Sequence, residues 1–163
     1  MNVERGREVI TLSDSNIQLR WATAADAQHI VKLNDLLPRD KHDFERVNHL
    51  KHAERKELIE LLPELLTWLQ DMNWPISIEI SEILVKIVPR ETIPLVKNIL
   101  KSDDDLWKLY CLRYFVMKLP SELLAIDNLK EELNRIATKP TKSEKLEEVH
   151  LTAQEIINLR RIL

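Results

Sequence analysis

The chain has 163 residues, of which 44% are hydrophobic and 31% charged, and it carries a formal net charge of −3. Gly6 is the only glycine and Cys111 the only cysteine, which excludes glycine-rich phosphate loops, dinucleotide-binding fingerprints, nucleophile elbows and an internal disulfide. Positive and negative charges are mixed along the chain and no long apolar run occurs, so neither a nucleic-acid-binding face nor a membrane span is expected.

The N-terminal segment, residues 1–35, differs from the rest of the chain. Val9–Leu12 and Ile17–Trp21 are β-prone and flank a turn-rich stretch, so a short β-hairpin is predicted. A lone hairpin is marginal in water and would have to pack on the helical body or on a partner. Thr23–Asp26 has the pattern of a capping box, which predicts a helix that continues to about Leu36.

From Leu36 onward the apolar residues recur at helical spacing. Pro63 fits the first turn of a helix and predicts a break in the leucine-rich run from Leu58 to Leu69. Pro75 opens the next helix. Ile76–Ile80 also alternates as a strand would, but the apolar stripe continues with helical period, so helix is favoured. The core stripe expected of this helix is Ile76, Ile80, Ile83, Leu84 and Ile87. The apolar residues at helical spacing before it are Phe44, Val47, Leu50, Leu58, Leu61, Leu62, Leu65, Leu66 and Leu69.

Prolines and acids divide the second half of the chain. Pro89 and Pro94 bracket a break, so a short helix is predicted over Ile93–Leu100. The acids Asp103–Asp105 suit the start of a long apolar helix over Leu106–Leu119, because the first helical turn has unpaired N–H groups.

The C-terminal part is predicted to hold three more helices. One begins at Pro120 and Ser121 and directs Leu124, Leu129, Leu133 and Ile136 inward. After a polar linker, two capping-box patterns predict two short terminal helices. The patterns are Thr141 with Glu144 and Thr152 with Glu155.

Two segments resemble each other. Residues 62–71 are similar to residues 93–102, and each is followed by a polar corner, a tryptophan (Trp74 or Trp107) and an apolar helix. An interval of roughly thirty residues is typical of stacked helical hairpins. We therefore expect an all-α, HEAT-like α-α superhelix, with the N-terminal hairpin as an addition. Such arrays present extended surfaces that suit protein binding.

A longer pattern supports the same fold. The sequence L-L-P-R-D-K-H-D at residues 36–43 is followed by W-L-Q-D-M-N-W-P at residues 68–75 and by L-K-S-D-D-D-L-W-K at residues 100–108. Together they resemble a mainly bacterial family of small helical proteins, the domain of unknown function DUF5071. The resemblance covers roughly residues 36–122 and implies a HEAT-like domain without an assigned activity. It also suggests a kinship with immunity proteins that neutralise toxins.

A second likeness lies upstream. Residues 17–27 are similar to the first strand and helix start of acetyltransferases that use acetyl-coenzyme A. The chain lacks the glycine-containing pyrophosphate loop that those enzymes have. A degenerate or atypical acyltransferase that binds acetyl-coenzyme A through this segment is therefore the alternative function.

Trp74 and Trp107 are the leading candidates for a binding surface, because tryptophan is over-represented at protein-binding hot spots. The polar residues Asp71, Asn73, Asp104 and Asp105 would form its rim, and Lys41 is a further candidate. The competing readings are structural. The rings could be core residues, the acids could cap helices, and Lys41 could form a surface ion pair. For Trp68, core packing is favoured over binding.

Catalytic and metal sites are not predicted. His42, His49 and His52 could share one helix face, but no second segment completes a zinc site. Cys111 lies on an apolar helix stripe and is expected in the core, where a thiol is inert.

These patterns lead to one set of expectations. The chain divides into an N-terminal extension (1–35), a HEAT-like domain (36–137) and a linker with C-terminal helices (138–163). We expect a cytoplasmic, non-catalytic protein-interaction module without cofactor or metal. Its expected partner is another protein, and in the more specific form of this hypothesis that partner is a toxin. Nucleic acid and membrane are not expected as partners, and pairing with a second copy of the chain stays open.

Overall fold

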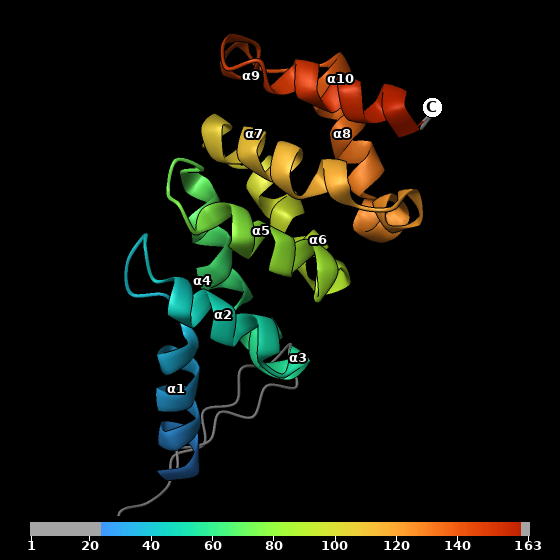
Figure 1. Ribbon diagram of the computed structural model, residues 1–163. Coiled ribbons are helices and arrows are strands. Elements are labelled where there is room, and N and C mark those ends of the chain that lie inside the picture. The colour runs from blue at the N-terminus through green and yellow to red at the C-terminus, as the bar shows by residue number, and fades with distance from the viewer. Residues whose placement is uncertain (1–23, 161–163) are drawn as a thin grey trace, which may run out of the picture.

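The computed structural model describes residues 24–160, and Figure 1 shows that the chain there is built of helices. No strand occurs in this part, so the all-α prediction is confirmed, while the predicted hairpin at residues 9–21 lies outside the described residues. The α-helices are α1 (Ala24–Leu36), α2 (Phe44–His52), α3 (Arg55–Glu60), α4 (Leu62–Thr67), α5 (Ser77–Lys86), α6 (Pro89–Leu100), α7 (Asp105–Tyr114), α8 (Leu129–Thr138), α9 (Lys142–Leu146) and α10 (Val149–Arg160). Three 3₁₀ segments join them: η1 (Trp68–Gln70), η2 (Val116–Lys118) and η3 (Ser121–Asn128).

The helices follow one another along an elongated molecule, with α1 at one end and α9 and α10 at the other (Figure 1). Helices pack on the next element in the chain and on elements up to three α-helices further along, and the most extensive packing is that of α10 against α8 and α7. The buried apolar residues form one continuous core that runs from Val47 on α2 to Ile157 on α10. Within the described part of the chain no helix is long and apolar enough to cross a membrane.

Helix α1 is joined to the rest by polar contacts and by Leu33 and Leu36, which are half-buried against the core. His29 Nε2 lies 2.6 Å from Glu60 Oε2, and Lys32 pairs with Glu57 on α3. Ile30 and Val31 are more than half exposed on this helix. Helix α1 therefore contributes little to the core that the later helices share.

The central helices form as the prolines predict, with one exception. Pro63 lies in the first turn of α4, and Ser77–Lys86 is helix, not strand. The predicted start at Ile93 is wrong, because α6 begins at Pro89 and contains Pro94. Proline has no backbone N–H. At the first helical position, where Pro89 lies, no hydrogen bond is lost, because an N–H there has no partner within the helix in any case. Pro94 cannot donate a hydrogen bond to the carbonyl of Arg90, four residues earlier. Both residues are exposed, so water can bind that carbonyl.

The predicted long helix over Leu106–Leu119 is shorter in the structure. Helix α7 ends at Tyr114 and tightens into η2. The backbone leaves α7 at Phe115 (φ −119°, ψ −66°), and Pro120 ends the 3₁₀ segment η2, because proline disfavours helical backbone at the residue before it. Leu119 has the extended ψ of 144°.

The helix predicted from Pro120 is two elements, η3 and α8, separated by a kink. Asp127 and Asn128 have positive φ angles of 52° and 55°. Aspartate and asparagine tolerate this left-handed region better than most residues, so the kink costs little conformational energy here. The four inward residues predicted for this segment are nevertheless all buried.

The caps were predicted with mixed success. Asp104, one of the acids expected at that helix start, caps α7, and Thr141 forms the predicted capping box with Glu144 on α9. Asp43 also caps a helix, α2. The second terminal capping box is wrong, because α10 begins at Val149 and Thr152 lies buried inside it. The side chain of Thr152 faces the core, where it does not cap a helix end.

Candidate functional site

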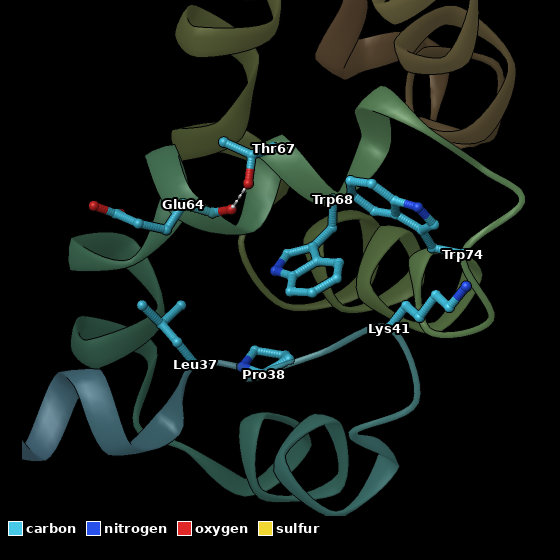
Figure 2. A pocket seen from close by; sticks show the side chains of 7 residues that line it. All are labelled: Leu37, Pro38, Lys41, Glu64, Thr67, Trp68 and Trp74. Atoms are coloured by element: carbon cyan, nitrogen blue, oxygen red, sulfur yellow. Dashed lines mark hydrogen bonds between the residues drawn. The ribbon is translucent and has the colours of Figure 1, made fainter.

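A groove between the loop after α1 and the corner after α4 is the leading candidate site. We call it the tryptophan groove; its volume is about 510 Å³, within the range of ligand pockets. Figure 2 shows the side chains that line it, which come from two segments far apart in the sequence: Leu37, Pro38 and Lys41 from the loop, and Glu64, Thr67, Trp68 and Trp74 from the corner.

The two tryptophans form the apolar wall. Their ring centroids lie 5.3 Å apart at an interplanar angle of 74°, an edge-to-face arrangement that aromatic pairs favour. Both rings are half-buried: Trp68 packs partly on the core, and both face the groove (Figure 2). The pair thus offers aromatic surface to a ligand while it is held by contacts on its other side.

The indole N–H groups of both rings are unpaired. Neither Trp68 Nε1 nor Trp74 Nε1 has a hydrogen-bond partner among residues 24–160. In the same part of the chain, Arg46 Nη1 is the only fully buried side-chain nitrogen or oxygen without a partner. The two indole nitrogens are therefore not fully buried, and the two rings that line the groove carry two free hydrogen-bond donors.

The corner that carries Trp74 is fixed by local hydrogen bonds. Asp71 Oδ1 accepts from the backbone N–H of Asn73 at 2.9 Å, and the N–H of Trp74 donates to the carbonyl of Asp71 at 3.2 Å. The buried hydroxyl of Ser77 lies 2.7 Å from the carbonyl oxygen of Trp68 and 3.1 Å from that of Asp71. Ser77 thereby ties the backbone of both tryptophans' segments to the start of α5.

The opposite wall is fixed by two aspartates. Asp40 Oδ1 accepts from the N–H of His42 at 2.8 Å, and Asp43 accepts from the N–H groups of Arg39 and Arg46 at 3.0 and 3.2 Å. These bonds hold the turn that presents Lys41. Pro38 is buried and has a fixed φ, so this wall starts from a rigid point.

The groove has a charge at each end. Lys41 lies on the Trp74 side and Glu64 on the opposite side (Figure 2). Both side chains are exposed, and neither has an ion-pair partner in the described part of the chain. A bound segment could therefore meet a free cation at one end and a free anion at the other.

The structure brings only some of the predicted site residues together. Trp74 and Lys41 line the tryptophan groove, and Asp71 and Asn73 lie in the corner next to it. Trp107 is half-buried against the core, and its indole N–H donates to the carbonyl of Leu66 at 3.1 Å. It does not line the groove.

The two acids beside Trp107 have partners of their own. Asp104 Oδ1 accepts from the N–H of Trp107 at 2.9 Å, as a helix cap. Asp105 is buried and lies 2.7 Å from Lys108 Nζ. Both side chains therefore have structural roles at the start of α7.

Asp105 and Lys108 belong to a buried ion cluster at the junction of α7, α8 and α9. Glu144, with an exposed fraction of 0%, lies 2.7 Å from Arg135 Nη2 and 3.0 Å from Lys108 Nζ. Arg135 also pairs with Glu132 at 2.6 Å. The cluster borders a polar cleft of about 660 Å³. Because the buried charges are paired with one another, the cluster joins α9 to the body.

The electrostatics of Glu144 follow from these bonds. Burial alone would raise the pKa of its carboxyl group, because burial disfavours the charged form. Hydrogen bonds from Arg135, from the N–H of Thr141 and from Lys108 outweigh burial and lower the pKa from 4.5 to about 2.

The structure places the other titratable candidates away from the groove. Cys111 is fully buried, as predicted, and burial raises the pKa of its thiol well above the ordinary value. His42 and His49 are exposed, and His52 Nδ1 lies 2.9 Å from the carbonyl of Asn48. Among residues 24–160 no three histidine, cysteine or acidic side chains lie together as a metal site would need.

Sequence reasoning missed five of the seven residues that line the groove. Trp68 was assigned to the core because of its helical phase, and Leu37, Pro38, Glu64 and Thr67 were not considered. The available signal was the spacing of Trp68 and Trp74 around a turn, since both flank the polar residues Asp71 and Asn73. The pairing of this corner with residues 37–41 requires the tertiary structure.

These features define an all-α protein with one aromatic groove between a loop and a helical corner. The model of the domain of unknown function DUF5071 matches residues 36–157, so the chain belongs to this family and the predicted resemblance is confirmed. The match includes both walls of the groove and ends within α10. No curated protein matches the sequence.

Proposed function

We propose that this protein is a non-catalytic protein-interaction module and that the tryptophan groove is its binding surface. The observation that carries the proposal is the pair Trp68 and Trp74, which expose aromatic surface and two free N–H groups on a rigid corner. Tryptophan is enriched among residues that dominate binding energy, and a fixed backbone reduces the entropy lost on binding.

A HEAT-like arrangement is part of the proposal. Two observations support it: each helix packs on elements close to it in chain order, either the next one or one up to three α-helices further along, and the molecule is elongated (Figure 1). Such arrays bind proteins through extended surfaces. A toxin that the protein neutralises is the specific partner we propose, on the family resemblance described above.

The test is affinity capture from a lysate of the organism that makes this protein, with bound partners identified by mass spectrometry. Trp74→Ala is compared with Leu151→Ala, which removes a half-exposed apolar side chain on α10, far along the chain from the groove. A partner retained by wild type and Leu151→Ala and lost by folded Trp74→Ala would support the proposal. A partner that Trp74→Ala binds as well as wild type would contradict the assignment of the groove.

The acyltransferase alternative makes a different prediction. Acetyl-coenzyme A at high concentration would raise the melting temperature if the folded chain bound it. We expect no shift, because Gly6 is the only glycine and the chain therefore lacks the glycine-containing pyrophosphate loop of those enzymes.

A further inference from the structure

The groove has chemical properties that select among the forms a protein ligand can take. Those properties are two aromatic faces, two free indole N–H donors, a buried proline and a free charge at either end. The inference below rests on the proposed function and names the kind of segment that this groove fits.

A ligand that covers the free N–H groups has to supply acceptors for them, because it displaces the water that bonds them otherwise. A helical ligand offers few backbone acceptors, because nearly all its carbonyls are already bonded within the helix. A strand would need a sheet edge, and residues 24–160 hold no strand. A polyproline II segment has no internal hydrogen bonds, so its carbonyls are free to accept. Aromatic-lined grooves bind such segments in several unrelated domains.

Lys41 disfavours a cationic ligand beside Trp74. Aromatic faces attract cations, and a methylated lysine or an arginine would be the usual occupant of an aromatic cage. Lys41, however, lies beside Trp74 and would repel a cation there. A neutral ring stacked on the tryptophans avoids this repulsion, and the charges of the ligand then belong at its ends.

We propose that the tryptophan groove binds an extended, proline-containing segment of the partner. The segment has an acidic residue at the Lys41 end and a basic residue at the Glu64 end. Its proline rings pack on Trp68 and Trp74, and its backbone carbonyls accept from the two indole N–H groups. The polyproline II conformation is preformed, so little conformational entropy is lost on binding.

The experiment uses the ¹⁵N-labelled full chain and two blocked peptides, Arg-Pro-Pro-Pro-Glu and its reverse, Glu-Pro-Pro-Pro-Arg. The chain has four tryptophans, so the indole N–H region of the NMR spectrum is simple to follow. We expect the signals of Trp68 and Trp74 to shift in a saturable way with one of the peptides. The signal of Trp107 stays in place, since its N–H is already bonded to Leu66.

Two controls separate proline recognition from charge attraction. Peptides in which alanine replaces each proline keep both charges, and we expect them to bind about tenfold more weakly or worse. Lys41→Glu changes an exposed side chain and leaves the core intact. We expect it to weaken binding of the better peptide about tenfold and to restore binding when the glutamate of that peptide is changed to arginine.

Three outcomes of the peptide titration would overturn the inference. They are equal affinity for proline and alanine peptides, an indole shift at Trp107 in place of Trp68 and Trp74, and no shift at millimolar peptide. A captured protein that requires Trp74 but is displaced by neither proline peptide would also overturn it, while the proposed function would stand. A partner that does not require Trp74 would overturn both.

Discussion

Single side chains decide whether the groove and the C-terminal end of the molecule keep their shape. Ser77 and Glu144 are both fully buried polar residues, and each satisfies groups from segments that would otherwise be only loosely joined. Burying a polar group costs free energy unless it is bonded, so these residues stabilise the fold through their partners.

Ser77→Ala is expected to lower the free energy of unfolding by about 1 to 2 kcal/mol, because the half-buried carbonyls of Trp68 and Asp71 lose the hydroxyl proton that they share. It should also weaken partner binding, since the backbone of Trp68 and Asp71 is no longer tied to α5. Ser81→Ala is the matched control: Ser81 is equally buried on α5, but its hydroxyl donates within its own helix, to Ile78. Urea denaturation measures the stability of both variants, and affinity capture measures their partner binding. Equal effects of the two substitutions on binding would contradict the role of Ser77.

Glu144→Gln is expected to destabilise the protein by about 3 kcal/mol at pH 7, because Lys108 and Arg135 lose a buried anion. Glu131→Gln, an exposed change on neighbouring α8, should cost less than about 0.5 kcal/mol. Loss of stability of the same size in both variants, measured by urea denaturation, would show that the ion cluster is not stabilising.

The same residue predicts a pH dependence. The pKa of Glu144 is lower in the folded protein, about 2, than its ordinary value of 4.5, so the unfolded chain binds the proton more readily. Its contribution is complete above about pH 5 and is lost as the pH falls toward 2, up to about 3 kcal/mol. Denaturation from pH 6 to pH 3 should show a steeper loss for wild type than for Glu144→Gln. Parallel curves would contradict the assignment.

At the scale of elements, α10 is part of the core. Val149, Ala153, Ile156 and Ile157 are buried against α7 and α8. The family match also extends into this helix. The C-terminal end is therefore expected to stabilise the rest of the fold.

Ile156→Ala tests this directly. Truncation of a fully buried isoleucine should cost about 2 to 5 kcal/mol. Leu159→Ala removes an apolar side chain that is 64% exposed on the same helix and should cost less than about 0.5 kcal/mol. If urea denaturation gave similar values for the two variants, α10 would not be an integral part of the core.

Elements whose signals are local could be predicted from the sequence. Pro63, Asp104 and Thr141 mark helix starts by their own chemistry, and each lies where it was expected. Pro94 misled, because a proline within a helix is tolerated where water can reach the freed carbonyl. Thr152 misled for a different reason: the capping pattern is present, but Thr152 lies inside α10 and its side chain is buried in the core.

At the scale of the whole molecule, the site depends on contacts that sequence patterns do not encode. The loop with Lys41 and the corner with Trp68 and Trp74 lie more than twenty residues apart in sequence, and only packing of the early helices brings them together. Equivalence within the internal repeat suggested that Trp107 would act like Trp74. The two rings differ because Trp107 donates to Leu66 and packs on the core, while Trp74 lies at the groove.

The central claim is that a protein partner binds at the tryptophan groove, and site-specific photo-cross-linking in cells of the source tests it most directly. A photoreactive residue replaces Thr67, an exposed side chain that lines the groove, or, as the control, Glu131, an exposed side chain on α8. We predict one protein cross-linked from position 67, absent from position 131, and lost when Trp74→Ala is added. The same protein cross-linked equally from both positions, or from position 131 alone, would contradict the claim.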